Sequence, residues 1–319
     1  MSESREVILE ARHITKKYPA KGGRTLTANN DISLCMYKGE TLGIVGESGC
    51  GKSTFMRMVV SLEKPTDGEI LFKGQDITKL KGEELRQSRR HIQMVFQDPS
   101  SAFSPRMKVG EIITEPLINF KMIKKSEKKA AAKRLLEMVD LSEDLAGRYP
   151  HELSGGQRQR VAIARAISIE PEVLICDEAT SALDVSVQKS IIELLVRLQK
   201  EKGITCGFIC HDIALIASFA HTVAVMYLGN IVEVLDACKV ADECAHPYTR
   251  ALVDSAFDIN MDHSKPVESL KGEIPSALDV PLGCPFASRC THCTEICKKE
   301  RPALKEISKG HMAACHLFG

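Results

Sequence analysis

A glycine-rich stretch near residue 50 has the residue types and spacing of a phosphate-binding loop. Residues 46–53 read Gly-Glu-Ser-Gly-Cys-Gly-Lys-Ser, which fits the pattern G-x-x-x-x-G-K-[ST]. In such a loop, backbone N–H groups surround nucleotide phosphates, and the positive end of the following helix points at them. Lys52 would reach the β- and γ-phosphates, and the Ser53 hydroxyl would ligate Mg²⁺. The residues expected to contact the nucleotide here are Gly46, Glu47, Ser48, Gly49, Cys50, Gly51, Lys52, Ser53 and Thr54.

Two adjacent acids at the end of an apolar run could supply hydrolytic chemistry. Residues 171–178 read Pro-Glu-Val-Leu-Ile-Cys-Asp-Glu, which predicts a buried strand that ends in Asp177 and Glu178. Asp177 would hold Mg²⁺, usually through water, and Glu178 would orient and polarise the attacking water. Many strands end in acids, so this signal is weak alone. A phosphate loop upstream strengthens it, because the carboxyl ends of parallel strands meet at one edge of a sheet.

The elements that must position these residues alternate in type along the chain. The apolar run 41–45 predicts a buried strand before the loop, and 54–62 predicts a helix after it. Residues 7–96 are rich in short β-type runs, about 98–168 are helix-rich, and 171–235 return to alternating strands and helices. Within the helix-rich part, 127–139 has the spacing of an amphipathic surface helix. Together these patterns predict a parallel α/β core with a helical insertion.

Composition narrows the class of protein. The chain has 319 residues and a formal net charge of +1, so no basic excess points to nucleic acid as a partner. Residues 1–10 are polar and mixed in charge, unlike a signal peptide. The apolar stretch 206–229 contains His211, Asp212 and His221, and we interpret it as two buried strands around a helix rather than a membrane span. We therefore expect a soluble chain that works at a membrane only through a partner.

Leu153-Ser154-Gly155-Gly156-Gln157 precedes a predicted helix over 158–168. Ser154 is a good N-cap, and the two glycines let the backbone approach an anion. This LSGGQ sequence, lying between a phosphate loop and an acidic strand, resembles the signature of ABC transporter ATPases. The resemblance covers residues 7 to about 235. It implies an ABC-type nucleotide-binding domain with a parallel sheet core, an antiparallel β subdomain and a helical insertion. It also implies that Ser154, Gly155, Gly156 and Gln157 contact ATP.

Other marks of this family follow in the expected order, and their roles are those that the resemblance implies. Tyr18 matches the aromatic residue that stacks on adenine. Gln97, after a strand over 92–96, matches the glutamine that senses Mg²⁺ and the attacking water. Residues 181–184, Ser-Ala-Leu-Asp, match the loop that contacts the opposite subunit, and His211 matches the switch histidine that touches the γ-phosphate. The implied catalytic residues are therefore Glu178, His211 and Gln97, and the implied Mg²⁺ ligands are Ser53, Gln97 and Asp177.

The resemblance also implies a mechanism and partners. Two such ATPases clamp two ATP molecules, each between the phosphate loop of one subunit and the LSGGQ of the other. The helix dipole behind Ser154 then stabilises a γ-phosphate held by the partner. Membrane subunits would dock near Gln97 and the helical insertion. Because every motif is intact, we predict a hydrolytically competent enzyme.

The segment from about 246 has a different character. Prolines recur, long periodic helices stop and cysteines cluster, so we divide the chain into 1–245 and a Cys-rich extension, 246–319. Residues 246–252 (His-Pro-Tyr-Thr-Arg-Ala-Leu) and 283–290 (Gly-Cys-Pro-Phe-Ala-Ser-Arg-Cys) resemble the tail of oligopeptide/dipeptide importer ATPases. Residues 97–101 with 105–107 are similar to the second of the two paralogous ATPases in such importers. At 103–104 this chain has Phe-Ser where that pattern has Leu-Asn.

This narrower resemblance implies a function and an assembly. The chain would be the ATP-hydrolysing subunit of a peptide importer, peripheral on the cytoplasmic face of the cell membrane. It would form a heterodimer with a paralogous ATPase, bind two integral permease subunits and serve an extracytoplasmic peptide-binding protein. The alternatives are a related importer for nickel chelates or opines, and a soluble ABC ATPase with no membrane partner.

Five of the twelve cysteines crowd the C-terminal segment, where clustered thiols in a reducing compartment favour a metal. Residues 290–293 have the C-x₂-C spacing of a zinc knuckle, which Cys297, Cys315 or His316 could complete. Four thiolates also suit a [4Fe–4S] cluster, and spacing alone favours neither metal over the other. A third reading leaves the thiols unligated. The importer resemblance implies a cluster held by Cys284, Cys290, Cys297 and Cys315, with Cys293 outside the set.

The other seven cysteines are scattered, and we interpret them mainly as buried thiols. Cys50 is the exception in position, since it lies in the phosphate loop at a helix N-terminus. Such a place lowers the pKa of a thiol and would suit an oxidant sensor. The competing reading is a small side chain that the loop tolerates.

Overall fold

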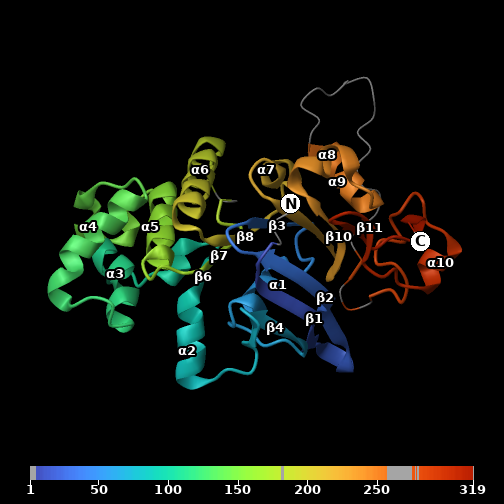
Figure 1. The fold of residues 1–319 in the computed structure, drawn as a ribbon, viewed down its shortest axis with the longest axis horizontal. Helices are drawn as coiled ribbons and strands as arrows, with labels where there is room; N and C mark the ends of the chain where they lie inside the picture. Colours follow the sequence, from blue (N-terminus) through green and yellow to red (C-terminus); the bar gives the residue numbers. More distant parts are fainter. Residues whose placement is uncertain (1–4, 181–182, 257–274, 277, 279, 319) are drawn as a thin grey trace. The chain divides into compact units, whose positions relative to one another are not determined.

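The structure is a computed structural model that describes residues 5–180, 183–256, 275–276, 278 and 280–318. The chain divides into two compact units. The first comprises residues 1–79 and 208–319, and the second comprises residues 80–207 (Figure 1). Each unit carries part of the predicted site. Ser181 and Ala182, predicted to contact an opposite subunit, lie outside the described residues.

The first unit contains an antiparallel sheet that matches the predicted β subdomain. Its strand order is β2-β1-β4-β5, and β1 pairs with both long neighbours: Glu10 lies opposite Cys35 on one side and Leu71 on the other. The strands are β1 (Val7–Pro19), β2 (Thr25–Tyr37), β4 (Asp67–Phe72) and β5 (Gln75–Asp76).

A second sheet in this unit carries the phosphate loop. Its strands run in the order β11-β12-β10-β9-β3-β8, and β8 crosses the boundary between the units. β3 lies parallel to β9, with Ile44 opposite Ala224, and every residue of β3 is buried. A parallel strand covered on both faces reads as a continuous apolar run, which is why residues 41–45 were recognisable. The strands are β3 (Thr41–Val45), β8 (Thr205–Cys210), β9 (Thr222–Tyr227), β10 (Asn230–Asp236), β11 (Lys305–Ser308) and β12 (His311–Ala313).

The edge of this sheet differs from the sequence prediction. The predicted sheet is parallel, but β10 pairs antiparallel with β9, and β12 pairs antiparallel with β10, where Val234 lies opposite Met312. The C-terminal residues therefore supply strands to the sheet that bears the phosphate loop. Beyond residue 245, where long periodic helices were expected to stop, the described residues form the ten-residue helix α9 (Pro247–Ala256) and one shorter helix. The apolar face of α9 is buried, which gives it the stabilisation that its ten residues could not provide alone.

The second unit combines a pair of parallel strands with helices. β6 (Ile92–Val95) pairs with β7 (Val173–Asp177), with Met94 opposite Ile175. Helices α3 (Val109–Asn119), α4 (Lys128–Met138) and α5 (Gly155–Ile167) pack on one another. The amphipathic helix predicted over 127–139 is confirmed as α4, which buries an alanine–leucine stripe and exposes Lys129 and Lys133. The other helices of this unit are α2 (Gly82–His91) and α6 (Val185–Lys202).

Short helices complete the two units. The interpretation of residues 206–229 as two strands around a helix is confirmed by β8, α7 (Ile213–Ala217) and β9. The remaining helices of the first unit are α1 (Lys52–Val59), α8 (Val240–Glu243) and α10 (Glu295–Lys299). Single 3₁₀ turns cover Lys21–Gly23, Pro99–Ala102, Lys125–Glu127, Glu143–Gly147, Pro150–Glu152, Ala237–Lys239 and His316–Phe318.

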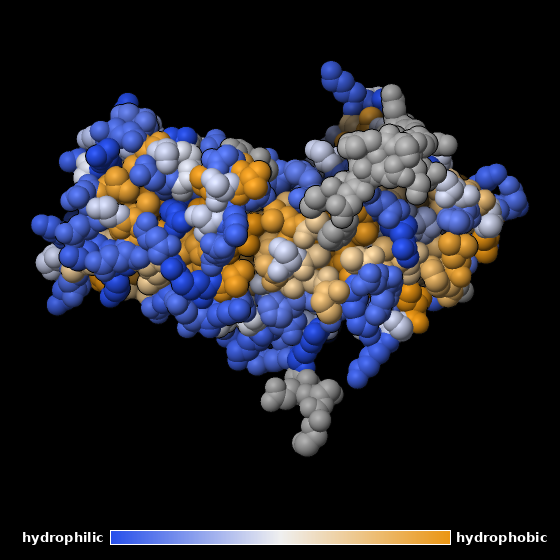
Figure 2. Space-filling model, turned by 90° about the horizontal axis from the view of Figure 1, so that it is seen from above, coloured by the Kyte–Doolittle hydropathy of each residue, from blue (hydrophilic) through white to orange (hydrophobic). Residues whose placement is uncertain are grey.

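The described helices include none that is both long enough and apolar enough to cross a membrane. On the face drawn in Figure 2, hydrophilic side chains cover much of the surface, and apolar residues gather in patches between them.

Candidate nucleotide-binding site

Two glycines allow the phosphate loop to lie directly against its neighbours. Gly51 has φ 103° and forms the N-cap of α1, and a Cβ there would lie 2.2 Å from the carbonyl oxygen of Ala28. A Cβ on Gly46 would lie 2.1 Å from the carbonyl oxygen of Met226. Only glycine fits such close backbone approaches, so these positions are set by packing as well as by the need to approach phosphate. α1 begins at Lys52, two residues before the predicted start.

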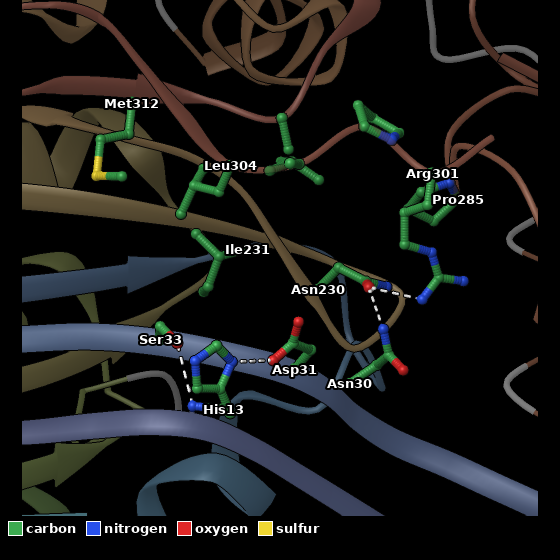
Figure 3. Close-up of a pocket in the computed structure, with 14 residues that line it drawn as sticks. His13, Asn30, Asp31, Ser33, Asn230, Ile231, Pro285, Arg301, Leu304 and Met312 are labelled. Atoms are coloured by element: carbon green, nitrogen blue, oxygen red, sulfur yellow. Dashed lines mark hydrogen bonds and ion pairs between the residues drawn. The ribbon is translucent and has the colours of Figure 1, made fainter. Parts of the chain in front are cut away.

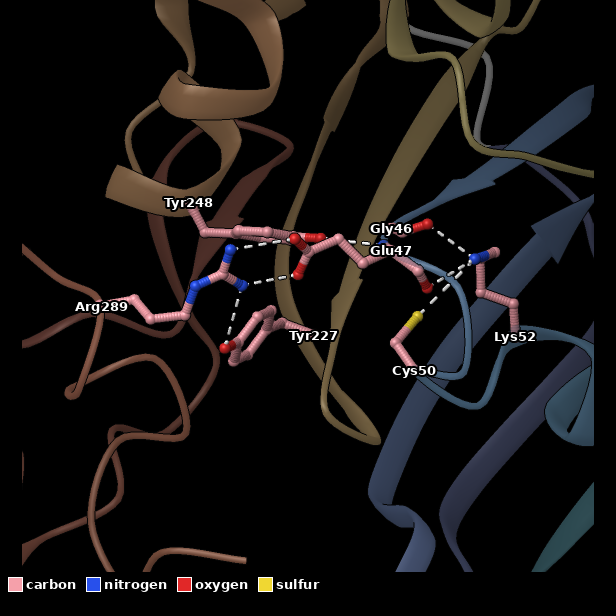
Figure 4. Close-up of polar contacts among 7 residues, drawn as sticks. All are labelled: Gly46, Glu47, Cys50, Lys52, Tyr227, Tyr248 and Arg289. Atoms are coloured by element: carbon pink, nitrogen blue, oxygen red, sulfur yellow. Dashed lines mark hydrogen bonds and ion pairs between the residues drawn. The ribbon is translucent and has the colours of Figure 1, made fainter. Parts of the chain in front are cut away.

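The Lys52 side chain lies inside the loop (Figure 4). It is 4 % exposed, and its Nζ donates to the carbonyl oxygens of Gly46 at 2.6 Å and Glu47 at 2.9 Å. Asn29 Nδ2 holds the far end of the loop by donating to the carbonyl oxygen of Gly51 at 3.1 Å. The Lys52 ammonium is therefore held against two backbone carbonyl oxygens of the loop.

The structure contradicts the expectation that the pKa of Cys50 is lowered. Burial raises the pKa of this thiol, although the nearby Lys52 ammonium acts in the opposite direction. The side chain is 5 % exposed, so desolvation of the thiolate outweighs the helix N-terminus. Cys50 is a buried thiol with a raised pKa, which favours the reading of a small tolerated side chain. Among the scattered cysteines, Cys238 is exposed rather than buried.

Tyr18 lies on β1 in the first unit and is half-buried. Its hydroxyl donates to the carboxylate of Glu63, and Lys16 Nζ lies 4.9 Å from the ring centre. Burial and the Glu63 carboxylate together raise the pKa of Tyr18 to about 12. The raised pKa favours the neutral phenol, and a hydrogen bond fixes its hydroxyl on the Glu63 carboxylate. Stacking of adenine on this ring stays a prediction.

The acids of the second unit lie where the sequence predicted them. Asp177 ends β7 and is buried, and Glu178 follows with φ 46°. A non-glycine residue in this left-handed region costs about 1–2 kcal/mol, and such strain is concentrated at functional sites. Gln97 Nε2 donates to Glu178 Oε2 at 2.7 Å. The structure therefore brings the predicted water-positioning pair together, across 81 positions of sequence.

The LSGGQ segment forms the start of α5. The Ser154 hydroxyl accepts from the N–H of Gln157 at 3.2 Å, and Gln157 Oε1 accepts from the N–H of Ser154 at 2.9 Å. This reciprocal pair is a capping box, and S-x-x-Q was its readable signal, so the capping role of Gln157 was missed in the sequence analysis. α5 begins at Gly155, three residues before the predicted start. Gly156 lies close to α6, since a Cβ on it would be 2.6 Å from Val187 Cγ1.

His211 directly follows β8 and is exposed. It belongs to the first unit, as do the phosphate loop and Tyr18. Gln97, Asp177, Glu178 and the LSGGQ segment belong to the second. Each unit therefore carries a chemically distinct share of the predicted site.

The cysteines of the C-terminal segment lie within electrostatic range of one another. Burial raises the pKa of Cys284 to about 11, and the charges of Cys297, Cys315 and Cys290 add to the effect. The N–H of Cys284 donates to the carbonyl oxygen of Cys297 at 2.7 Å. Across the described residues, however, no three His, Cys, Asp or Glu side chains are arranged so as to hold a metal ion. The thiols are gathered without forming a ligand shell.

A cavity in the first unit is lined by both polar and apolar side chains, and its wall includes none of the predicted site residues (Figure 3). It has a volume of about 380 Å³, and its wall includes His13, Asp31, Asn230 and Arg301. Asn230 Oδ1 accepts from Asn30 Nδ2 at 3.0 Å and from Arg301 Nη1 at 3.3 Å. These contacts join β2, β10 and the C-terminal segment, and they contain no group of the predicted ATP chemistry.

Comparison with known proteins places this geometry in a family. The family described as ABC transporter matches residues 29–181, and the oligopeptide/dipeptide transporter C-terminal region matches residues 232–297. The oligopeptide transport ATP-binding protein AppF of Bacillus subtilis (strain 168) is 45% identical over 99% of this chain and 98% of its own length. OppF of Escherichia coli (strain K12) is 42% identical over 99% of this chain and 97% of its own length.

The chain belongs to the ATP-binding subunits of the oligopeptide/dipeptide ABC transporter family.

Solved structures agree with this assignment. The ABC transporter cassette MJ0796, solved as a dimer, is 33% identical with a TM-score of 0.66, covering 72% of this chain and 98% of its own. A post-hydrolysis structure of MJ0796 with ADP and Pi gives a TM-score of 0.65 at 32% identity. The fold of this family member is thus that of the ABC ATPases, and ATP hydrolysis is its enzymatic activity.

Proposed function

We propose that the chain hydrolyses ATP to drive a peptide importer, as a peripheral subunit on the cytoplasmic face of the membrane. The observation that carries this proposal is the pairing of an intact ATPase site with an importer-type tail. Gln97 Nε2 donates a hydrogen bond to Glu178 Oε2 at 2.7 Å. The C-terminal region of oligopeptide/dipeptide transporters matches residues 232–297. Relatives named as oligopeptide transport proteins, AppF and OppF, support peptides as the cargo.

The residues divide the chemistry between them. Backbone N–H groups of the 46–53 loop, other than those of Glu47 and Cys50, and the Lys52 ammonium would bind the phosphates. Tyr18 would stack on adenine. Mg²⁺ would be held by Ser53, Gln97 and Asp177, whose oxygens suit it, and it would neutralise charge on the phosphates. Glu178, positioned by Gln97, would accept a proton from the attacking water. His211 would contact the γ-phosphate.

Assembly would complete the site. We propose a heterodimer with a paralogous ATPase, in which Ser154, Gly155, Gly156 and Gln157 contact ATP bound to the partner. The capping box supports this role, because it uses the Ser154 and Gln157 side chains to orient the first turn of α5. The free N–H groups of that turn then point outward from the helix, where they can meet an anion.

The proposed assembly includes two integral permease subunits, which would in turn serve an extracytoplasmic peptide-binding protein. A groove in the second unit supports docking of one of these permeases. It measures about 220 Å³ and lies beside β6 and α3, next to Gln97 in the sequence. Its wall includes Val95, Phe103, Pro116, Phe120, Arg165 and Ile169. Arg165 Nε is buried and has no hydrogen-bond partner among the described residues. Such a donor would be satisfied by a carbonyl on an inserted helix end.

For the tail we propose a [4Fe–4S] cluster on Cys284, Cys290, Cys297 and Cys315. The donor set fits chemically, since four thiolates hold such clusters, and the four thiols influence one another's pKa. His316 favours a cluster over a zinc site that uses this histidine, because its Nε2 lies 3.0 Å from the carbonyl oxygen of Glu300. The cluster would cross-link a segment that has few large apolar residues.

Glu178→Gln tests the ATPase proposal. The amide cannot accept a proton, so ATP turnover should fall by about 10²–10⁴-fold while ATP binding persists. Glu170→Gln is a matched control, because Glu170 is an exposed glutamate of the same unit that also has positive φ, 55°. Turnover by Glu178→Gln equal to that of the control would refute the role of Glu178.

Uptake of labelled peptides tests the cargo. Membrane vesicles that contain the subunit, its paralogue, the permeases and the binding protein should accumulate peptide in an ATP-dependent way. Accumulation should stop when the subunit carries Glu178→Gln. Uptake of nickel chelates or opines instead of peptides would assign the chain to the related importers. ATPase activity without any association with permeases would favour the soluble class.

Metal analysis tests the cluster. Anaerobically purified chain should contain about four irons and four acid-labile sulfides. Cys284→Ser should lose both, whereas Cys238→Ser, at an exposed cysteine outside the set, should keep them. Stoichiometric zinc, or chain without metal, would overturn this part of the proposal and leave the ATPase assignment intact.

A further inference from the structure

A glutamate of the phosphate loop is held from outside by an arginine of the C-terminal segment (Figure 4). Arg289 Nη1 lies 2.7 Å from Glu47 Oε2, and Arg289 Nη2 lies 3.1 Å from Glu47 Oε1. The contact is bidentate, the geometry in which an arginine–carboxylate pair is most specific. The arginine side chain is 4 % exposed and that of the glutamate 22 %. This is therefore an enclosed ion pair rather than a chance contact between two surface side chains.

A second hydrogen bond joins the same loop residue to the C-terminal part of the chain. Tyr248, on α9, accepts from the backbone N–H of Glu47 at 2.9 Å through its hydroxyl. Tyr227, at the end of β9, has its hydroxyl 3.4 Å from Arg289 Nη1. Both the backbone and the side chain of Glu47 are thus held by residues that lie about 200 positions away in the sequence.

Packed aromatic rings fix the positions of the side chains that contact Glu47. The rings of Tyr227 and Tyr248 lie 4.7 Å apart between centroids, and Phe286 lies 5.2 and 5.4 Å from them. All three side chains are almost completely buried. Phe286 and Arg289 belong to the same short segment, so burial of the phenylalanine fixes the place of the arginine. Side chains locked in this way can position a partner without losing further conformational entropy.

Neutralising the charge of Glu47 would favour binding of an anionic nucleotide. A carboxylate beside a phosphate-binding loop repels a polyphosphate, and this repulsion grows where water is excluded. Arg289 compensates the charge of Glu47 and draws its carboxylate toward the C-terminal segment. Lys52 lies on the other side of the loop from Arg289 (Figure 4). The two cations therefore have different partners: Lys52 contacts the backbone of the loop, and Arg289 neutralises and orients the Glu47 carboxylate.

We propose that Arg289 is a positioning residue for ATP binding, which acts through Glu47 to set the shape and charge of the phosphate loop. It does not touch the reacting atoms. The loop would be completed by the C-terminal segment, and a displacement of residues 284–290 would lower the affinity for ATP. This gives the segment a function in the nucleotide site besides any metal that it holds.

The first test is Arg289→Gln in the full-length chain. The Kd for MgATP should rise about tenfold, since loss of a charge-assisted pair is worth roughly one factor of ten or more. In the transporter in vesicles, KM for ATP should rise by a similar factor, and kcat should stay within about threefold. Arg289→Lys keeps the charge but not the bidentate geometry, so its Kd should lie between those of the wild type and Arg289→Gln.

A double-mutant cycle separates this role from a purely structural one. Because the harm in Arg289→Gln comes from an uncompensated carboxylate, adding Glu47→Gln should recover affinity for ATP. The double variant should therefore bind ATP more tightly than Arg289→Gln alone. Independent, additive losses from the two changes would overturn the proposal. So would a Kd for Arg289→Gln equal to that of the wild type.

A matched control excludes a general effect of losing an arginine. Arg12 pairs with Glu10 at 2.8 Å on β1 in the same unit, but its side chain is 48% exposed. Arg12→Gln should leave the Kd for MgATP unchanged. If Arg289→Gln does not fold, Arg289→Lys still tests the proposal. Arg289→Lys must then bind ATP more weakly than the wild type while its thermal midpoint stays within a few degrees, and equal affinity would refute the proposal.

Discussion

His311 Nε2 lies 2.7 Å from Glu233 Oε1, and both side chains are buried. Glu233 is on β10, and its carboxylate also accepts from the N–H groups of Ala245 at 2.6 Å and His246 at 3.1 Å. One fully buried acid thus joins the start of α9 and the last strand, β12, to the sheet that bears the phosphate loop. A buried carboxylate is tolerated only when its oxygens are satisfied, and here three donors do so.

Glu233→Gln should destabilise the chain, because an amide oxygen and an NH₂ group cannot satisfy three donors. We expect a loss of about 3 kcal/mol in the free energy of unfolding, measured by urea denaturation. Glu243→Gln is the control: its partner Lys239 lies 3.0 Å away, but both side chains are about half exposed. That change should cost less than about 0.5 kcal/mol. Equal losses from the two variants would contradict the anchoring role of Glu233.

Stability should fall between pH 6.5 and pH 4 because of His246. Burial lowers the pKa of His246 to about 4, and its Nδ1 accepts from the N–H of Tyr248 at 3.1 Å. The unfolded chain binds a proton below pH 6.5 that the folded chain resists until about pH 4. His246 therefore favours unfolding by up to about 3 kcal/mol as the pH falls through this window.

The measurement compares the free energy of unfolding of the wild type with that of His246→Gln, which does not titrate in this range. The difference in stability between them should shift by about 3 kcal/mol in favour of the variant as the pH falls from 7 to 4. A difference that stays constant over this range would show that His246 is not held neutral by burial.

Gly156→Ala should impair ATP hydrolysis, and Val187→Ala should restore it. A Cβ on Gly156 would lie 2.6 Å from Val187 Cγ1, so α5 must shift away from α6 and carry the LSGGQ segment with it. A displacement of about 1 Å in groups that position the nucleotide is enough to lower kcat by about tenfold or more. Shortening Val187 removes the opposing methyl groups.

ATPase rates of the two single variants and the double variant in the assembled transporter measure this effect. Val187→Ala alone should stay within about threefold of the wild type, since it only opens space. A double variant as slow as Gly156→Ala would mean that the glycine serves the nucleotide directly rather than the packing of the two helices.

Gly283→Ala should weaken metal retention in the C-terminal segment. A Cβ there would lie 2.3 Å from the carbonyl oxygen of Cys297, and this contact is with rigid backbone. The methyl group would separate Cys284 from Cys297 and break their 2.7 Å backbone hydrogen bond. Iron content per chain after anaerobic purification should fall below half of the wild-type value.

Gly147→Ala is the control for this change, because a Cβ on Gly147 would meet open space and the backbone there does not have positive φ. It should retain iron at the wild-type level. Retention of iron by both variants would show that close approach of Cys284 to Cys297 is not needed for the site.

Local patterns predicted much of the nucleotide site. The phosphate loop was predicted from its residue types and spacing, and it strengthened the prediction for the acidic strand end. The role of the LSGGQ segment came from its resemblance to a family signature. Element ends were less accurate: α1 and α5 begin two and three residues before their predicted starts. The N-caps of these two helices are Gly51 and Ser154. The first helical turn was missed because hydrophobic periodicity carries no information about capping residues.

Contacts between distant segments could not be read in this way. The antiparallel strands β10 and β12 join the sheet across about 78 positions, and short apolar runs carry no signal of their partner. The pKa of Cys50 was misjudged for a related reason. Its position in the sequence indicated a helix N-terminus, whereas the burial that raises the pKa comes from the surrounding tertiary structure.

The sequence by itself determined the chemistry of this protein: a loop for phosphates, an acid for water and a segment of gathered thiols. Tertiary structure decided which residues act on one another. It placed Gln97 on Glu178, three donors on Glu233, and Arg289 on Glu47 across 242 positions. The physical reason is that local backbone preferences depend on near neighbours. The pairing and desolvation of charges depend on the whole packed chain.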